Sequence, residues 1–103
     1  EKAYRQAVQF MVQKHNAYLN LGNMYYKNLH QVDDAITAYR AAVEHMKAFR
    51  SKMFSSKPYL ALGIALRAKG EYDEARRALE VARRYSKTRE RAEAELARLP
   101  KRD

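Results

Sequence analysis

The sequence contains no cysteine and no tryptophan, only two prolines and three glycines, and 12 acidic side chains against 21 basic ones in 103 residues. Without cysteine the chain has no disulfide framework, no thiolate metal ligand and no cysteine nucleophile. No apolar run approaches the roughly 18 residues that a membrane-spanning helix requires, and no signal-peptide pattern begins the chain. We therefore expect a cytoplasmic protein without membrane insertion. Because the chain begins at Glu1 rather than at a methionine, we expect it to be a piece of a longer protein.

What the chain does contain is typical of one small helical domain. Hydrophobic residues make up 47% of it, which argues against a disordered tail despite the net charge of +9. A domain usually takes about 100–200 residues, so the chain forms one at most. Alanine, leucine, arginine, lysine and glutamate are abundant, and these residues favour helices. The composition therefore predicts an all-α fold.

Two motifs recur along the chain with nearly the same period. Residues 3–8 (AYRQAV) recur 35 residues later as residues 38–43 (AYRAAV), and a looser copy occupies residues 78–83 (ALEVAR). Residues 18–22 (YLNLG) recur 41 residues later as residues 59–63 (YLALG). Motifs that alternate at a fixed period are typical of repeat architectures, in which each unit packs on its neighbours.

These motifs resemble the pattern of the tetratricopeptide repeat family. The second unit carries the pattern at Tyr59, Leu62, Gly63, Leu66, Gly70, Tyr72, Ala75, Leu79 and Ala82. The first unit carries it at Tyr18, Leu21, Gly22, Tyr25, Ala35, Tyr39 and Ala42. The first unit departs from the pattern in its turn, residues 27–32, which lacks the glycine and has one extra residue. The resemblance implies an α-solenoid of antiparallel helix hairpins, a superhelix in this family.

The layout expected from the resemblance is a single domain over residues 1–103. It comprises the second helix of an incomplete repeat (1–14), two repeats (15–54 and 56–88) and a C-terminal capping helix (89–99), with the helices of the repeats at 15–28, 33–54, 56–69 and 73–86. The serines before Pro58 are expected to cap the helix that starts there. Gly22 and Gly63 would lie in mid-helix, where glycine costs about 0.5–1 kcal/mol relative to alanine, so we expect close helix contacts at both.

The resemblance also implies where a ligand would bind, because in this family the first helix of each repeat lines a concave groove. The residues expected there are Asn16, Leu19, Asn20, Asn23, Tyr26, Lys27, Lys57, Leu60, Ile64 and Arg67. Amides among them could pair with a peptide backbone, and the cations could attract acidic groups. Alternatively, the amides are only solvated, and Leu19, Leu60 and Ile64 pack on neighbouring helices. A clamp for a terminal carboxylate, known in the family, fits in neither possible register, because Ala61 replaces a required polar residue in both.

No residue pattern supports catalysis, a cofactor or a metal. His15, His30 and His45 are 15 residues apart, which is no ligand spacing on a helix. The serines lack a nucleophile-elbow context, and no glycine-rich phosphate loop occurs. We therefore expect neither an enzyme nor a small-molecule substrate.

The incomplete first repeat and the basic residues leave three hypotheses about function open. The first is a non-catalytic scaffold that binds a peptide segment or helix of a partner protein carrying acidic groups. The second is a homo-oligomerisation module that completes the solenoid between chains. The third is a nucleic-acid-associated scaffold, in which Arg76, Arg77, Arg83 and Arg84 contact phosphates. No nucleic-acid motif accompanies these arginines, so the sequence favours the first hypothesis.

Overall fold

The computed structural model describes residues 2–49 and 56–100, with the side chains at 2–5, 7–9, 11 and 46–49 left out. Its helices are α1 (Lys2–Asn23), which continues into the π-helical turn η1 (Met24–Asn28), α2 (Val32–Phe49), α3 (Lys57–Lys69), α4 (Tyr72–Arg83) and α5 (Ser86–Ala97). No strand occurs in these two ranges, and the predicted all-α solenoid fold is confirmed.

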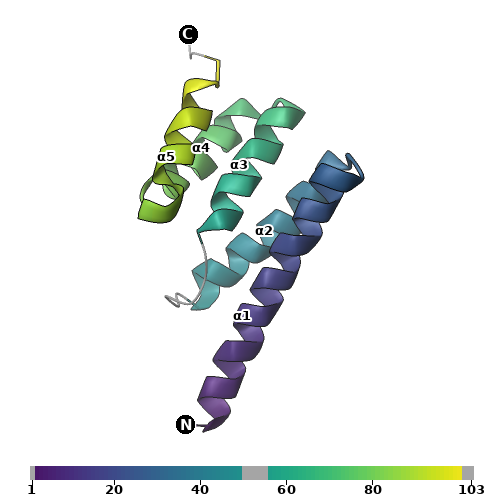
Figure 1. Ribbon diagram of the computed structural model, residues 1–103, viewed down its shortest axis with the longest axis vertical. Coiled ribbons are helices and arrows are strands. Elements are labelled where there is room, and N and C mark those ends of the chain that lie inside the picture. The colour runs from purple at the N-terminus through teal and green to yellow at the C-terminus, as the bar shows by residue number, and fades with distance from the viewer. Residues whose placement is uncertain (1, 50–55, 101–103) are drawn as a thin grey trace.

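The helices form two antiparallel hairpins followed by one more helix. The first hairpin is α1 with α2, and the second is α3 with α4. The hairpins join where α2 packs against α3, and α5 packs on α4 and touches α3. Figure 1 shows α1, α3 and α5 toward the viewer, with α2 and α4 behind them. The first helix of each hairpin and α5 thus share one face of the molecule.

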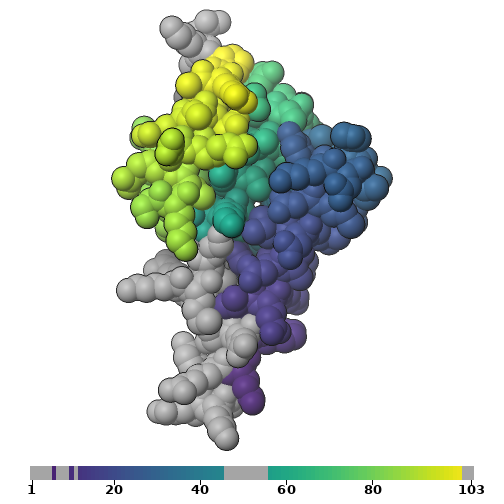
Figure 2. All heavy atoms as spheres, viewed as in Figure 1, coloured from purple at the N-terminus to yellow at the C-terminus, as the bar shows by residue number. Residues whose placement is uncertain are grey.

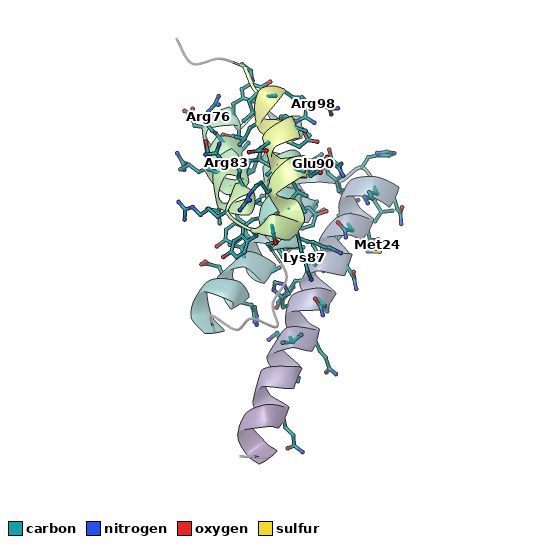
Figure 3. All side chains as sticks on the ribbon, turned by 60° about the vertical axis from the view of Figure 1, so that its left-hand side comes forward. Met24, Arg76, Arg83, Lys87, Glu90 and Arg98 are labelled. Atoms are coloured by element: carbon teal, nitrogen blue, oxygen red, sulfur yellow. The ribbon has the colours of Figure 1, made fainter. Side chains whose placement is uncertain are left out.

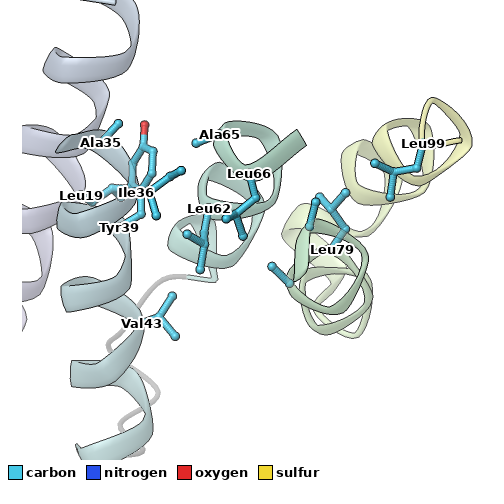
Figure 4. Close-up of a cluster of buried hydrophobic side chains, with 12 residues drawn as sticks. Leu19, Ala35, Ile36, Tyr39, Val43, Leu62, Ala65, Leu66, Leu79 and Leu99 are labelled. Atoms are coloured by element: carbon cyan, nitrogen blue, oxygen red, sulfur yellow. The ribbon is translucent and has the colours of Figure 1, made fainter. Parts of the chain in front are cut away.

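One hydrophobic cluster connects all the helices. It begins at Leu19 on α1, passes through Ile36 and Tyr39 on α2 and Leu66 on α3, and ends at Leu99 after α5. Figure 4 shows the α2 side chains of this cluster facing those of α3, with Leu79 and Leu99 on the far side of α3. Because the cluster is continuous, each hairpin completes the core of the next, as solenoid repeats do.

The two mid-helix glycines lie where the hairpins are tightest, as the sequence predicted. A Cβ added at Gly22 would stand 2.5 Å from the Tyr39 ring, and one at Gly63 would stand 2.5 Å from Leu79 Cγ. The partner helices are those expected, but the side chains in contact are Tyr39 and Leu79. A side chain larger than hydrogen at either glycine would push the helices of its hairpin apart.

The two hairpin turns differ because of the extra residue in the first. In the second turn Gly70 adopts φ 95°, and the Gly70 and Glu71 amides donate to the carbonyls of Arg67 and Leu66, which is a Schellman motif. In the first turn His30 takes the left-handed conformation with φ 53°. The corresponding amide of Gln31 donates to Tyr25 O, one residue further back. The π-helical turn η1 therefore absorbs the inserted residue.

The expected break between helices at residues 13–15 is wrong, because α1 runs through it. Gln13, Lys14 and His15 include no glycine, proline or capping residue that would end a helix. His15 is fully buried, with Nδ1 3.1 Å from Ala42 O, so α1 is packed against α2 at this point. The assignment of residues 1–14 to an incomplete repeat stays a prediction.

The expected start of the last helix at residue 89 is also wrong, because α4 ends at Arg83 and α5 begins at Ser86. Thr88 ties α5 to the end of α4: it is buried, and its hydroxyl donates to Ala82 O at 2.7 Å. The same hydroxyl lies 3.1 Å from Ser56 Oγ. Ser56 therefore makes no side-chain cap on α3, contrary to expectation, although Pro58 does lie in the first turn. The predicted end of the second helix at residue 54 lies outside the described residues.

Candidate functional site

We call the face shared by α1, α3 and α5 the front face; the residues that the sequence predicted as ligand contacts belong to α1, η1 and α3. In Figure 2 the atoms of α3 lie between those of α5 and the C-terminal part of α1. On α3 the predicted residues Lys57, Leu60, Ile64 and Arg67 follow the spacing of three and four residues that places them on one side of a helix. Three helices therefore contribute side chains to one surface.

The amides of α1 supply the polar part of the front face. Asn16 and Asn20 are exposed, whereas Asn23 is half-buried and accepts a hydrogen bond of 2.6 Å from the Tyr39 hydroxyl at Oδ1. This bond holds the Asn23 side chain in one orientation and leaves its NH₂ group to donate elsewhere. Burial raises the pKa of the Tyr39 hydroxyl from its ordinary value of 10.0 to about 12, with a further contribution from Tyr26.

The apolar part of the front face is smaller than predicted. Leu60, Ile64 and Tyr26 are half-buried, and Leu60 and Tyr26 pack against the core cluster. Leu19 is only 8% exposed and belongs to the core itself, which corrects its assignment as a contact. Its side chain points at α2 because it follows His15 by four residues on the same side of α1. Packing on a neighbouring helix was the alternative left open for Leu19.

The predicted cations fall into two groups. Lys27 and Lys57 are exposed. Arg67 is half-buried, and one of its terminal nitrogens lies 3.1 Å from Oε1 of Glu95 on α5. The contact explains why Arg67 lies against the protein, since a buried carboxylate requires a partner.

Sequence reasoning missed Glu95 and the arginines around it. Glu95 is only 4% exposed, although it is charged and its neighbours Glu93 and Ala94 on α5 are exposed. Its Oε2 lies 3.7 Å from Arg91 Nε and 3.8 Å from an Arg98 terminal nitrogen. The spacing of four and three residues predicts these two pairs within a helix. The contact between Glu95 and Arg67 depends on how α5 packs against α3. Residue spacing within a single helix does not predict such a contact.

Of the four arginines considered for phosphate contacts, three are exposed (Arg77, Arg83 and Arg84) and Arg76 is half-buried. Arg76 donates to Pro100 O at 2.8 Å, and Arg83 pairs with Glu80 at 3.0 Å. In Figure 3, Arg76 and Arg83 lie on the left of the view with α4, and Arg98 points to the right from α5.

A hollow of about 280 Å³ lies between α2 and the α3–α4 turn, and Ile36 and Leu66 are among the residues that line it. Two ion pairs cross it, Lys69 to Asp33 at 2.8 Å and Arg40 to Glu74 at 2.5 Å. The hydrogen bond to Asp33 raises the pKa of Lys69. All four side chains are well exposed. Exposed ion pairs stabilise a protein by about 0–1 kcal/mol each, so these two add little to the stability that comes from the apolar packing of α2 against α3.

The described part of the chain brings no three histidine, aspartate or glutamate side chains together as a metal site. Among its helices, none is long and apolar enough to cross a membrane.

The comparison with known protein families identifies the repeat. A family model described as tetratricopeptide repeat matches residues 13–88, which include the C-terminal half of α1 and all of α2, α3 and α4. No curated protein and no solved structure shows a significant match to the chain. Members of this family are generally protein–protein interaction modules and typically non-catalytic scaffolds. From the repeated motifs, the packed hairpins and this match, we conclude that the chain belongs to the tetratricopeptide repeat family.

Proposed function

We propose that the front face binds a peptide segment or a helix of a partner protein, and that the protein acts as an adaptor without catalysing a reaction. The observation that carries the proposal is the row of α1 amides, Asn16, Asn20 and Asn23, beside the half-exposed Leu60 and Ile64 of α3. Amide groups can pair with the backbone of a docked segment, while apolar positions take up its side chains. Lys27 and Lys57 add positive charge for acidic groups of the partner.

The experiment that tests this function begins with photo-crosslinking from two positions. A photoreactive amino acid at Asn20 on the front face is expected to crosslink a partner from native lysate, whereas the same amino acid at Arg77 on α4 is expected not to. The crosslinked segment is then synthesised, and its affinity is measured by calorimetry. Asn20→Ala combined with Ile64→Ser is expected to weaken binding about tenfold or more. Equal crosslinking from both positions, or an unchanged affinity, contradicts the proposal.

A second candidate function is self-association, which an exposed apolar strip on α1 favours. Phe10 is 58% exposed, and Leu21 and Met24 are also exposed. Their spacing places them on the side of α1 away from His15 and Leu19, which face α2. Contiguous apolar surface marks interaction sites, and of these residues Leu21 and Met24 lie one helical turn apart where α1 continues into η1.

Light scattering over a range of protein concentrations tests self-association. If the strip joins two copies, the mass rises with concentration, and Leu21→Glu returns the protein to a monomer. A monomer mass at every concentration removes this candidate and leaves the front-face proposal untouched.

A further inference from the structure

Three arginines converge on the single buried carboxylate of Glu95, at the α5 side of the front face. Arg67 reaches Oε1 from α3, and Arg91 and Arg98 approach Oε2 from within α5 and its C-terminal end. The group contains three positive charges and one negative charge, so it keeps an excess of two positive charges. We call Arg67, Arg91, Arg98 and Glu95 the arginine cluster.

The outer two arginines of the cluster retain hydrogen-bonding capacity. Their nitrogens lie 3.7 and 3.8 Å from Oε2, which is close enough for attraction but too long for a hydrogen bond. A guanidinium has five N–H donors in a planar fork that matches a carboxylate or a phosphate. The side chains of Arg91 and Arg98 are 67% and 65% exposed, so an incoming group can reach them.

Glu95 places these two side chains beside the rest of the front face. Without it, two long arginines on an exposed helix would repel each other and Arg67. With it, their charges are drawn to one point between α3 and α5. Figure 3 shows Arg98 projecting toward the side of the view where α1 lies.

We propose that Arg91 and Arg98 bind an anionic side chain of the partner segment, a carboxylate or a phosphate, with Glu95 as the positioning residue. This proposal rests on the proposed function, since it names the chemistry that one end of the docked segment must carry. A single anionic group fits the cluster better than a nucleic-acid backbone does. The exposed acids Glu90 and Glu93 alternate along α5 with the exposed bases Lys87, Arg89 and Arg91, so this helix offers no uniformly basic track for a chain of phosphates.

Nuclear magnetic resonance on the whole chain, labelled with ¹⁵N, tests the proposal through the arginine side-chain Nε–H signals. The probes are four nine-residue peptides of alternating alanine and leucine, with glutamate, phosphoserine, serine or lysine at the centre, together with inorganic phosphate and a single-stranded 12-mer RNA. We expect the glutamate and phosphoserine peptides to shift the Arg91 and Arg98 signals and to bind about tenfold more tightly than the serine peptide. The ratio of the glutamate and phosphoserine affinities separates the two anion sources.

The matched variants are Arg91→Ala with Arg98→Ala, and Arg77→Ala with Arg84→Ala as the control. Each pair removes two exposed arginines, so the net charge changes equally. The first pair is expected to abolish the preference for the anionic peptides, whereas the control pair leaves it unchanged. Thermal unfolding of both variants checks that they remain folded.

Each other outcome overturns the proposal in a recognisable way. If all four peptides bind equally, as seen in the amide signals of Asn20 and Ile64, the front face binds peptides but the arginine cluster does not select anions. If no peptide binds, the proposed function fails as well. If RNA shifts the Arg91 and Arg98 signals and the anionic peptides do not, the cluster serves nucleic acid.

Discussion

At the scale of single residues, the mid-helix glycines Gly22 and Gly63 leave no room for a Cβ atom. Gly22 meets the ring of Tyr39, which is 2% exposed and held by its hydrogen bond to Asn23. Gly63 meets Leu79, which is fully buried. Such interiors are packed as densely as crystals, so the neighbours have little room to move.

Gly22→Ala is therefore expected to lower the free energy of unfolding. Overpacking against the Tyr39 ring costs about 1–3 kcal/mol, more than the roughly 0.5–1 kcal/mol that alanine gains in a helix. Urea denaturation followed by circular dichroism measures the difference. Gly70→Ala is the control for backbone strain without crowding, because φ is 95° there and no atom lies within 4 Å of the added Cβ. A Gly22→Ala variant as stable as the unsubstituted protein contradicts the close contact.

Tyr39→Phe tests the hydrogen bond to Asn23 and its dependence on pH. At neutral pH the loss is expected to be about 1 kcal/mol, the usual net value of one such bond. The Tyr39 pKa is about 12 in the folded protein, against the ordinary tyrosine value of 10.0 in the unfolded chain, so the unfolded chain loses the proton first as pH rises. The contribution of the protonated Tyr39 hydroxyl to the free energy of unfolding is therefore complete below about pH 10. It is lost as the pH rises from about 10 to 12. Unfolding free energies between pH 8 and 12 should fall more steeply for the unsubstituted protein than for Tyr39→Phe.

At the scale of elements, each hairpin turn contains one residue in the left-handed backbone conformation, but the residue differs between the two turns. Gly70 adopts the left-handed conformation without strain in the second turn, whereas His30 adopts it in the first, after the π-helical turn η1. For a residue with a Cβ this conformation costs about 1–2 kcal/mol. The turn of the first hairpin therefore carries backbone strain that the turn of the second hairpin does not.

Replacing His30 with glycine is expected to stabilise the protein by about 1 kcal/mol, because the strain disappears while the turn keeps its shape. His30→Ala serves as the matched control, since alanine keeps the Cβ and should leave the free energy of unfolding nearly unchanged. Thermal and urea unfolding of the three proteins give the comparison. Equal effects of the two substitutions would mean that the imidazole, not the backbone conformation, matters at this position.

The joint between α3 and α5 depends on the Arg67–Glu95 pair. Arg67→Ala leaves a buried carboxylate with only the two distant arginines, and the expected cost is about 3 kcal/mol. Arg67→Met combined with Glu95→Met is expected to restore most of the loss, because no charge then remains buried. Urea unfolding of the single and double variants completes the test. A single variant within about 0.5 kcal/mol of the original protein contradicts the burial of this pair.

At the scale of the whole molecule, the continuous core predicts that the two hairpins unfold together. Ile36 is 4% exposed and belongs to the cluster that joins α2 to α3. Ile36→Ala is expected to cost about 2–5 kcal/mol, as for other buried isoleucines. Because the loss falls on the joint, amide exchange in α1 and α4 should report equal stability in the unsubstituted protein and different stabilities in the variant. Thr37→Ala, on the exposed side of the same helix, is the control.

The sequence by itself determined the repeat, and with it the hairpins, the close contacts at both glycines and the turn at Gly70. These features are periodic or local, and a period repeats the same packing wherever it occurs. It also indicated the insertion in the first turn, although not that a π-helical turn would absorb it.

Only the tertiary structure decided which side chains of the front face remain available. Leu19 lies in the core, Asn23 is held by Tyr39, and Arg67 is bound to Glu95. The burial of Glu95 depends on the approach of α5 to α3, two helices whose residues in contact are 28 positions apart along the chain. Periodicity assigns residues to the sides of one helix, but it does not report how far the next helix covers them. For that reason the arginine cluster is found only in the tertiary structure and is not predicted by the sequence pattern.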